Sequence, residues 1–197
     1  MIRAFYAAIA AMAAALVALA CAASASALTV SPSGDYLLET TSFEWRQTSN
    51  GQQVACGMNQ LALELDSRGV GEAPAGTGVW SGCSNSLYGA FTLTQVADWP
   101  VTMQLTASPF KLAAVVQVPA SGLQFSVAGC TFWVEGTFEL VAAASSLPAT
   151  VATASILSSS LRISRNNGGF TCFAWAAALA VTFMGEYDVD RTMTVSG

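Results

Sequence analysis

The sequence predicts an all-β fold: a disulfide-stapled antiparallel β-sandwich or barrel, preceded by a helical signal peptide. Three observations support this. Apolar and polar residues alternate along many segments, which is typical of strands with one buried face. Four cysteines follow the first 27 residues, an even number that suits a disulfide framework. Turn-forming residues recur between the alternating segments, so we expect roughly nine to eleven short strands.

The first 27 residues have the features of a cleavable export signal. Arg3 is the only charged residue before Asp35, and an Ala-rich apolar run follows it. Ala25-Ser26-Ala27 supplies the small residues at which signal peptidases cut. We therefore expect residues 1–27 to be removed and residues 28–197 to form a single domain, secreted or held at the cell surface.

Two alternatives to cleavage after residue 27 are less well supported. A membrane anchor is disfavoured because small residues crowd the end of the apolar run and no basic cluster follows it. A lipoprotein would be cut before Cys21, but Ala18-Leu19-Ala20 fits the usual lipoprotein signal poorly. In the mature chain we expect no transmembrane segment.

Composition excludes several classes of partner. The net charge is −5, and loss of Arg3 with the signal would make it −6. An acidic, sparsely charged chain without a basic stretch is not suited to bind nucleic acid or anionic membranes. A mature chain of 170 residues is long enough for one sizeable core.

Cysteine usage agrees with an oxidising compartment. Cys21 would leave with the signal, and the four remaining cysteines allow three pairings. We favour Cys56–Cys83 and Cys130–Cys172, because each pair then brackets one half of the domain. A metal site is disfavoured because the chain has no CxxC motif and no histidine.

Alternation is clearest in four segments. Each has its apolar residues on one parity: Val101, Met103 and Leu105; Leu87, Phe91 and Leu93; Leu123, Phe125 and Val127; and Phe132, Val134, Phe138 and Leu140. The intervening positions are mostly polar, so each segment is predicted to be a strand with one buried face and one wetter face.

Turn signals separate these strands. They are Asn50-Gly51, Asp66-Ser67-Arg68-Gly69, the stretch 71–78, Ser121-Gly122, Ser145-Ser146-Leu147-Pro148 and Asn166-Asn167-Gly168-Gly169. Gly168-Gly169 has no phosphate-loop spacing and is interpreted as a turn. Since only closure removes sheet edges, we expect an exposed edge somewhere. Residues 28–48 could pair with such an edge in their own or a neighbouring subunit.

The Ala-rich segment 173–184 could be a helix or a strand. It is too short to span a bilayer. Its large residues share one parity, which a strand would place on one face and a helix would scatter. These large residues are Phe173, Trp175, Leu179, Val181 and Phe183. We predict a core strand whose parity continues into Tyr187 and Val189.

No catalytic chemistry is evident in the sequence. The absence of histidine excludes Ser-His and Cys-His nucleophile systems. The carboxylates that could work in pairs are Glu39 with Glu44, Glu64 with Asp66, and Glu135 with Glu139. Glu186, Asp188 and Asp190 could contribute oxygen ligands to calcium. All of these lie on polar parities typical of solvated strand faces, so we expect no enzyme activity, no cofactor and no metal.

Tryptophans are the candidate binding residues. Of the five, Trp175 fits the core, whereas Trp80 and Trp99 lie near turns and Trp133 lies on a polar parity. Trp80, Trp99 and Trp133 are therefore candidates for surface binding of sugars, lipids or partner proteins. The alternative is that the tryptophans cap the open ends of the sandwich.

The layout resembles the PraB-like secreted proteins, which are described as activators of alkane oxidation, and similar secreted proteins of actinobacteria. The features that carry the resemblance are Thr29-Val30-Ser31-Pro32-Ser33-Gly34, Cys56 entering a strand, Gly82-Cys83, the segment Ala97-Asp98-Trp99-Pro100-Val101-Thr102, and the late Cys130 and Cys172. The resemblance implies a small extracellular β-protein linked to surface adhesion or to handling of hydrophobic substrates. It implies no catalytic residues.

Three functions follow as hypotheses. The first is a secreted, non-catalytic structural or adhesive protein of the cell surface, acting by self-association or by binding surface components. The second is a binder or emulsifier of apolar molecules such as alkanes or lipids, in a barrel interior or on an apolar patch. The third, and weakest, is a glycosidase with two facing carboxylates.

Overall fold

The computed structural model describes residues 27–47, 51–107, 109–167, 172 and 180–197, so nearly all of the predicted signal lies outside the described residues. The strands, in chain order, are β1 (Thr29–Ser31), β2 (Gly34–Thr40), β3 (Phe43–Gln47), β4 (Gln53–Cys56), β5 (Met58–Leu65), β6 (Val70–Ala73), β7 (Val79–Ser81), β8 (Ser84–Asn85), β9 (Gly89–Ala90), β10 (Thr92–Gln95), β11 (Trp99–Ala107), β12 (Phe110–Val127), β13 (Cys130–Ala142), β14 (Ala149–Asn166), β15 (Ala180–Met184) and β16 (Glu186–Ser196). None of the described residues forms a helix with the length and hydropathy needed to cross a bilayer. The predicted all-β class is confirmed.

Several separately labelled strands are parts of one longer run of chain. Only one or two residues separate β2 from β3, β4 from β5, and β15 from β16. β2–β3 therefore forms one pass of the chain, which pairs with β4–β5 on one side and with β15–β16 on the other. β6, β7 and β8 follow one another along β5 and β4. β9, β10 and β11 then run back beside them. With β12, β13 and β14, the chain makes eight passes.

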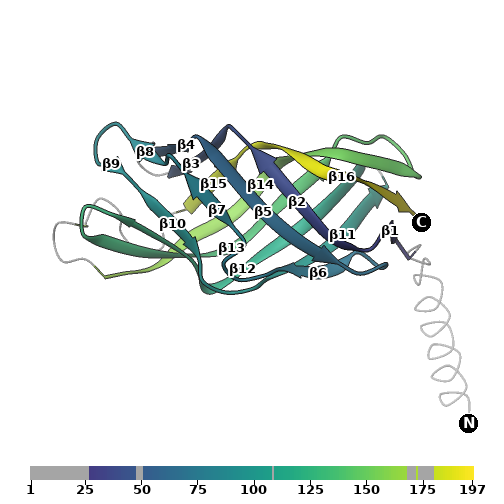
Figure 1. The fold of residues 1–197 in the computed structure, drawn as a ribbon, viewed down its shortest axis with the longest axis horizontal. Helices are drawn as coiled ribbons and strands as arrows, with labels where there is room; N and C mark the ends of the chain where they lie inside the picture. The colour runs from purple at the N-terminus through teal and green to yellow at the C-terminus, as the bar shows by residue number, and fades with distance from the viewer. Residues whose placement is uncertain (1–26, 48–50, 108, 168–171, 173–179) are drawn as a thin grey trace, which may run out of the picture.

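The eight passes close into a barrel (Figure 1). Each pass is antiparallel to the one before it, and β15 and β16 pair with β3 and β2 of the first pass. The result is an eight-stranded up-and-down barrel. Closure decides between the predicted sandwich and barrel, and it removes the sheet edge that we expected. β1 pairs with the end of β16, so the described part of residues 28–48 pairs within its own chain.

The expectation of nine to eleven short strands is wrong, because several strands run the length of the barrel. β12 and β14 have 18 residues each. The turn expected at Ser121-Gly122 is also wrong: these residues lie inside β12, at an irregularity where the pairing with β13 shifts between Val118 and Leu123. Ser121 has a φ of 62°, and both Val118 and Leu123 are buried. A bulge at this point lets one long strand bend while its apolar face stays inside.

Leu87 was predicted to face the core with Phe91 and Leu93, and this is wrong for Leu87 alone. Phe91 and Leu93 are buried, whereas Leu87 is 66% exposed in the turn between β8 and β9. The Asn85 side chain stabilises this turn, because its Oδ1 accepts hydrogen bonds from the backbone N–H groups of Leu87 (2.8 Å) and Tyr88 (3.1 Å). β8 therefore ends at Asn85, although the alternating pattern of the sequence continues to Leu87.

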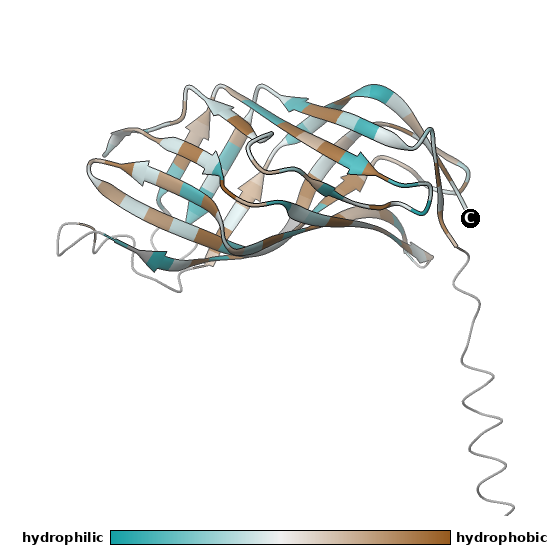
Figure 2. Ribbon diagram, turned by 60° about the horizontal axis from the view of Figure 1, so that its bottom comes forward, coloured by the Kyte–Doolittle hydropathy of each residue, from teal (hydrophilic) through white to brown (hydrophobic). Residues whose placement is uncertain are grey.

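Hydrophobic and hydrophilic residues alternate along many strands (Figure 2), and most of the hydrophobic ones are buried. Val181 and Phe183 are buried as predicted, and Tyr187 continues their parity. Residues 173–179, including Trp175, lie outside the described residues. The core contains an aromatic cluster in which each ring contacts two others. Its members are Phe43, Trp80, Trp99, Phe138 and Phe183.

Candidate functional site

The three tryptophans predicted as surface binders have different environments. Trp99 is 1% exposed and its Nε1 donates to the Gly122 carbonyl at 3.1 Å, so the prediction is wrong for Trp99. Trp80 is half-buried and packs against Trp99 in the aromatic cluster. Trp133 is half-buried on the outer face of β13, with the Arg165 guanidinium 3.9 Å from its ring centre. The structure does not bring the three side chains together into one surface.

Both predicted disulfides are present. Cys56 bonds to Cys83, and Cys130 bonds to Cys172. The first joins cysteines 27 residues apart in sequence, and the second joins cysteines 42 residues apart. In Figure 1, β4, which holds Cys56, and β8, which follows Cys83, lie in the half of the barrel away from the C-terminus. The disulfides are typical of a protein that folds in an oxidising compartment.

Four of the six carboxylates considered for paired acid catalysis are held by cations on the barrel exterior. Arg162 donates through Nε and Nη2 to Glu135, at 2.9 and 2.6 Å. Lys111 forms an ion pair with Glu139, and Glu44 lies 3.7 Å from Arg46. The Val70 backbone N–H and the Arg68 guanidinium lower the pKa of Asp66. These contacts are those of surface ion pairs rather than of a shared catalytic cleft.

Seven of the remaining carboxylates gather on one side of the barrel, which we call the acidic wall. It comprises the outer faces of β16, β2, β5 and β6, and its exposed members are Asp35, Glu39, Glu64, Glu72, Glu186, Asp188 and Asp190. Asp35 is registered with Glu64, Glu64 with Glu72, and Glu39 with Asp188. Among the described residues, no group of three or more possible ligands is arranged to hold a metal ion.

A small apolar cavity lies in the half of the barrel nearest the C-terminus, which we call the aliphatic end. Its lining consists of Leu38, Leu63, Leu65, Met103, Ala114, Leu140, Ala142, Val151, Ala154, Val189 and Met193. Its volume is about 30 Å³. A water molecule needs a cavity of about 10–15 Å³ and several polar partners. The lining offers no polar side chain, so the space suits a small apolar group.

One seam of the barrel is interrupted beside this cavity. β16 is registered with β2 only at Asp188 and Val189, and its pairing with β14 shifts between Val151 and Thr153. Within the described chain, residues 190–192 of β16 therefore have no registered strand partner. In place of a backbone pair, the Asp190 carboxylate accepts a hydrogen bond from the Leu37 backbone N–H at 2.9 Å.

An arginine occupies this seam. The Arg191 guanidinium lies 4.4 Å from the centre of the Tyr36 ring. Its Nε and Nη2 atoms are buried and make no hydrogen bond with the described residues. Burial raises the pKa of the Tyr36 hydroxyl, an effect that Arg191 opposes and Asp190 reinforces. That hydroxyl donates to the Pro32 carbonyl.

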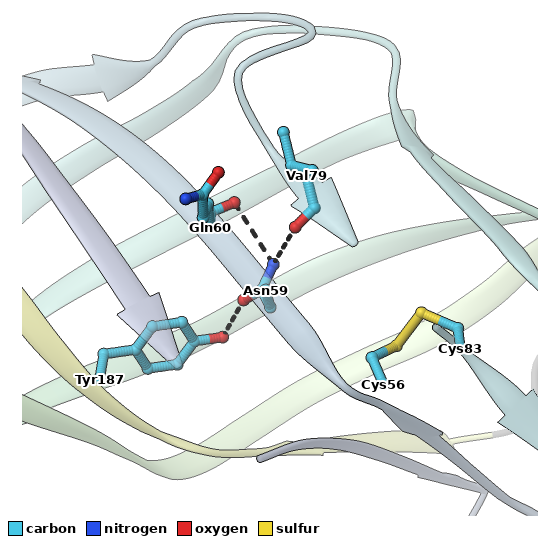
Figure 3. Close-up of a disulfide and its surroundings, with 6 residues drawn as sticks. All are labelled: Cys56, Asn59, Gln60, Val79, Cys83 and Tyr187. Carbon is cyan, nitrogen blue, oxygen red and sulfur yellow. Dashed lines mark hydrogen bonds between the residues drawn. A yellow bond between two sulfur atoms is a disulfide. The ribbon is translucent and has the colours of Figure 1, made fainter. Parts of the chain in front are cut away.

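A buried polar network links β16 to β5 and β7 inside the barrel (Figure 3). The Tyr187 hydroxyl donates to Asn59 Oδ1, and Asn59 Nδ2 donates to the carbonyls of Val79 (3.1 Å) and Gln60 (3.3 Å). Burial raises the pKa of Tyr187 strongly. These groups satisfy one another, and this is the arrangement expected of an internal cross-link.

Sequence reasoning missed the aliphatic end and Arg191. The signal for Arg191 was its parity: Tyr187, Val189, Met193 and Val195 are apolar at alternate positions, and Arg191 stands at an inward position among them. A single charged residue among alternating apolar residues is predicted to be buried, and a buried charge is costly unless it has a partner. The cavity itself depends on which small residues face one another across the barrel, and alternation alone does not predict that.

The fold and site define a disulfide-linked, eight-stranded up-and-down barrel with an apolar interior and a polar exterior. No family model, no curated protein and no solved structure matches this chain. The resemblance to the PraB-like proteins therefore stays a prediction.

Proposed function

We propose that this protein is a non-catalytic extracellular barrel that binds a small apolar molecule at its aliphatic end. The observation that supports this proposal is the cavity of about 30 Å³, lined by eleven apolar side chains inside a closed barrel. Eight-stranded barrels have interiors that side chains just fill or that hold one small ligand. In this barrel the aliphatic end keeps free space.

The lining can adapt to a ligand larger than the cavity. Met103 and Met193 face the cavity from β11 and β16, and the unbranched side chain of methionine changes rotamer easily. Ala114, Ala142 and Ala154 contribute little volume to the same lining. Displacement of one methionine side chain would extend the space along the barrel axis, so short alkyl chains are the ligands best suited to it.

The interrupted seam offers a route to the cavity. Opening the barrel where its strands are continuously registered would break a backbone ladder, whereas residues 190–192 make no registered ladder with their described neighbours. Val189 and Met193, on either side of this stretch, both line the cavity. A ligand that separates β16 from β2 at this point breaks the Asp190–Leu37 hydrogen bond and few other backbone interactions.

The test is binding of n-pentane by the purified mature protein. Thermal unfolding should shift upward in n-pentane-saturated buffer, because a ligand that binds the folded state alone stabilises it. Ala154→Val and Ala142→Val add methyl groups inside the cavity and should remove the shift. Ala55→Val adds the same atoms at an exposed position of β4 and is the matched control. A wild-type protein whose unfolding temperature is raised neither by n-pentane nor by the five-carbon alcohol and acid would contradict the proposal.

A structural or adhesive role at the cell surface is the second candidate, and the acidic wall favours it. Seven exposed carboxylates on four adjacent strands would attract a basic surface or be bridged to another surface by cations. The test is adsorption of the mature protein to cells and to basic polymer beads at low and high salt. A protein that stays monomeric at high concentration and adsorbs to neither would exclude this role.

A further inference from the structure

We infer that the molecule bound at the aliphatic end is a short-chain monocarboxylate, with its alkyl chain in the cavity and its carboxylate on Arg191. This inference rests on the proposed function and adds the chemical class of the ligand. Its observations are the inward position of Arg191, its two unpaired buried nitrogens, and the broken seam around it.

Arg191 lies on the cavity face of β16. Residues two apart in a strand share a face, and both Val189 and Met193 line the cavity. Buried Tyr187 and Val195 continue the same parity on either side. On β2, Leu38 lines the cavity, and Tyr36, two residues away, stacks on the guanidinium. The charged group therefore lies beside one end of the apolar space.

The unpaired atoms of Arg191 are the two that hold carboxylates elsewhere in this protein. Arg162 uses Nε and Nη2 to bind Glu135, and Arg68 uses Nε and Nη2 to bind Asp66. These two N–H groups form one edge of the planar guanidinium and match the two oxygens of a carboxylate. In Arg191 the same edge is buried without a hydrogen bond to any described residue.

The neighbouring polar groups are committed to other contacts. Asp190 Oδ1 accepts the Leu37 backbone N–H, and its side chain is on the exposed face of β16. The Tyr36 hydroxyl donates to the Pro32 carbonyl. Burying charged donors without acceptors is costly, and a ligand carboxylate would remove that cost. An alcohol or an alkane would remove much less of it.

Gly34 keeps space open at the guanidinium. It has a φ of +117°, and a Cβ built at this position would lie 3.2 Å from Arg191 Nη2. A side chain at residue 34 would therefore press on the edge that we assign to the carboxylate. The small volume of the cavity limits the alkyl chain to a few carbons unless Met103 or Met193 moves.

The experiment compares pentanoate with 1-pentanol, which have equal chain lengths, by titration calorimetry on the mature protein. We expect pentanoate to bind at least about tenfold more tightly, since a hydrogen bond between a guanidinium and a carboxylate is stronger than one between a guanidinium and a neutral hydroxyl. Equal affinities would overturn the inference and leave the proposed function intact. Failure of n-pentane, 1-pentanol and pentanoate alike to bind would overturn the proposed function itself.

Arg191→Met keeps an unbranched side chain and should abolish the preference for pentanoate while keeping 1-pentanol binding. Arg191→Lys retains the charge without the two-pronged edge and should keep only part of the preference. Arg162→Met, which removes an outward arginine, is the control and should leave both affinities unchanged. A preference that survives in Arg191→Met would overturn the assignment of the carboxylate to Arg191.

A wild-type measurement guards against a variant that fails to fold. The carboxyl carbon of ¹³C-labelled pentanoate can be followed by NMR as pH falls. Bound beside a guanidinium, the carboxylate should have a pKa below that of the free acid. A bound pKa equal to or above the free value would show that the carboxylate does not contact Arg191.

Discussion

Tyr187 and Asn59 are joined by a hydrogen bond across the barrel interior, although β16 and β5, which carry them, are separated by β2 (Figure 3). Both residues are buried, and Asn59 is further bonded to the Val79 carbonyl of β7. The network thus links the last pass of the chain to the second and third passes. It lies in the interior of a barrel whose other inward side chains are mostly apolar.

Loss of the Tyr187 hydroxyl should destabilise the barrel through Asn59. Tyr187→Phe leaves Asn59 Oδ1 buried without its donor, which costs about 1–3 kcal/mol of unfolding free energy. Urea unfolding measures this change. The double variant Tyr187→Phe, Asn59→Leu removes both partners and should cost less than the sum of the two single changes. Additive losses would show that the two side chains are not coupled.

Stability should fall in alkaline solution because of the same tyrosine. Burial raises the pKa of Tyr187 in the folded state above its ordinary value near 10. The folded protein therefore keeps a proton that the unfolded chain releases. This contribution to stability is complete below pH 10 and declines above it, by up to about 1.4 kcal/mol per pH unit for one group. Unfolding free energies measured from pH 8 to 11.5 should fall more in the wild type than in Tyr187→Phe.

Much of this fold was predictable because alternation in a barrel is a local property. Phe132, Val134, Phe138 and Leu140 share a parity, and all four are buried. The cysteine pairing was also predictable from the order of the chain. Ser121-Gly122 was misread because the same residues that form turns also form bulges, and the choice depends on the strand alongside.

The candidate site was less predictable, because it depends on pairings between distant segments. Trp99 lies next to a turn in sequence, yet β6 and β12 flank its strand and bury it. Arg191 acquires its role from Tyr36, more than 150 residues earlier in the chain. The predicted parity of Tyr187 and Val189 was not extended to residue 191, and parity alone does not tell which residue lies opposite it.

A buried glutamine gives a stability prediction that is independent of the ligand site. Gln47 is fully buried on β3, and neither side-chain amide atom has a hydrogen-bond partner among the described residues. Gln47→Leu should therefore stabilise the protein by about 1–3 kcal/mol, since the cost of an unpaired buried amide disappears. Thermal and urea unfolding measure the gain.

Gln95 provides the matched control for Gln47. It is buried to a similar degree, but its Nε2 donates to the Ala73 carbonyl at 2.8 Å and its Oε1 accepts from the Gly78 backbone N–H at 2.8 Å. Gln95→Leu should destabilise the protein, because it leaves those backbone groups without partners. If both substitutions destabilise the protein, the Gln47 side chain is hydrogen-bonded and the prediction is wrong.

The acidic wall should cost the barrel stability at low ionic strength. Glu64 on β5 lies between Asp35 on β2 and Glu72 on β6, and like charges directly opposite one another on neighbouring strands repel. Glu64→Gln should raise the unfolding free energy by about 0.2–1 kcal/mol in 10 mM salt. The gain should shrink in 1 M salt, where the screening length falls to about 3 Å.

Glu135→Gln is the matched control for Glu64→Gln, because it also removes one negative charge but from a carboxylate that has a cation partner. Glu135 is paired with Arg162, so its neutralisation removes an attraction and should leave stability unchanged or slightly lower. The adhesive role proposed as the second candidate would use this wall as a contact for a surface of opposite charge. Should Glu64→Gln be no more stable than wild type at low salt, the three carboxylates do not repel one another enough to support that reasoning, and the adhesive role would lose its structural basis.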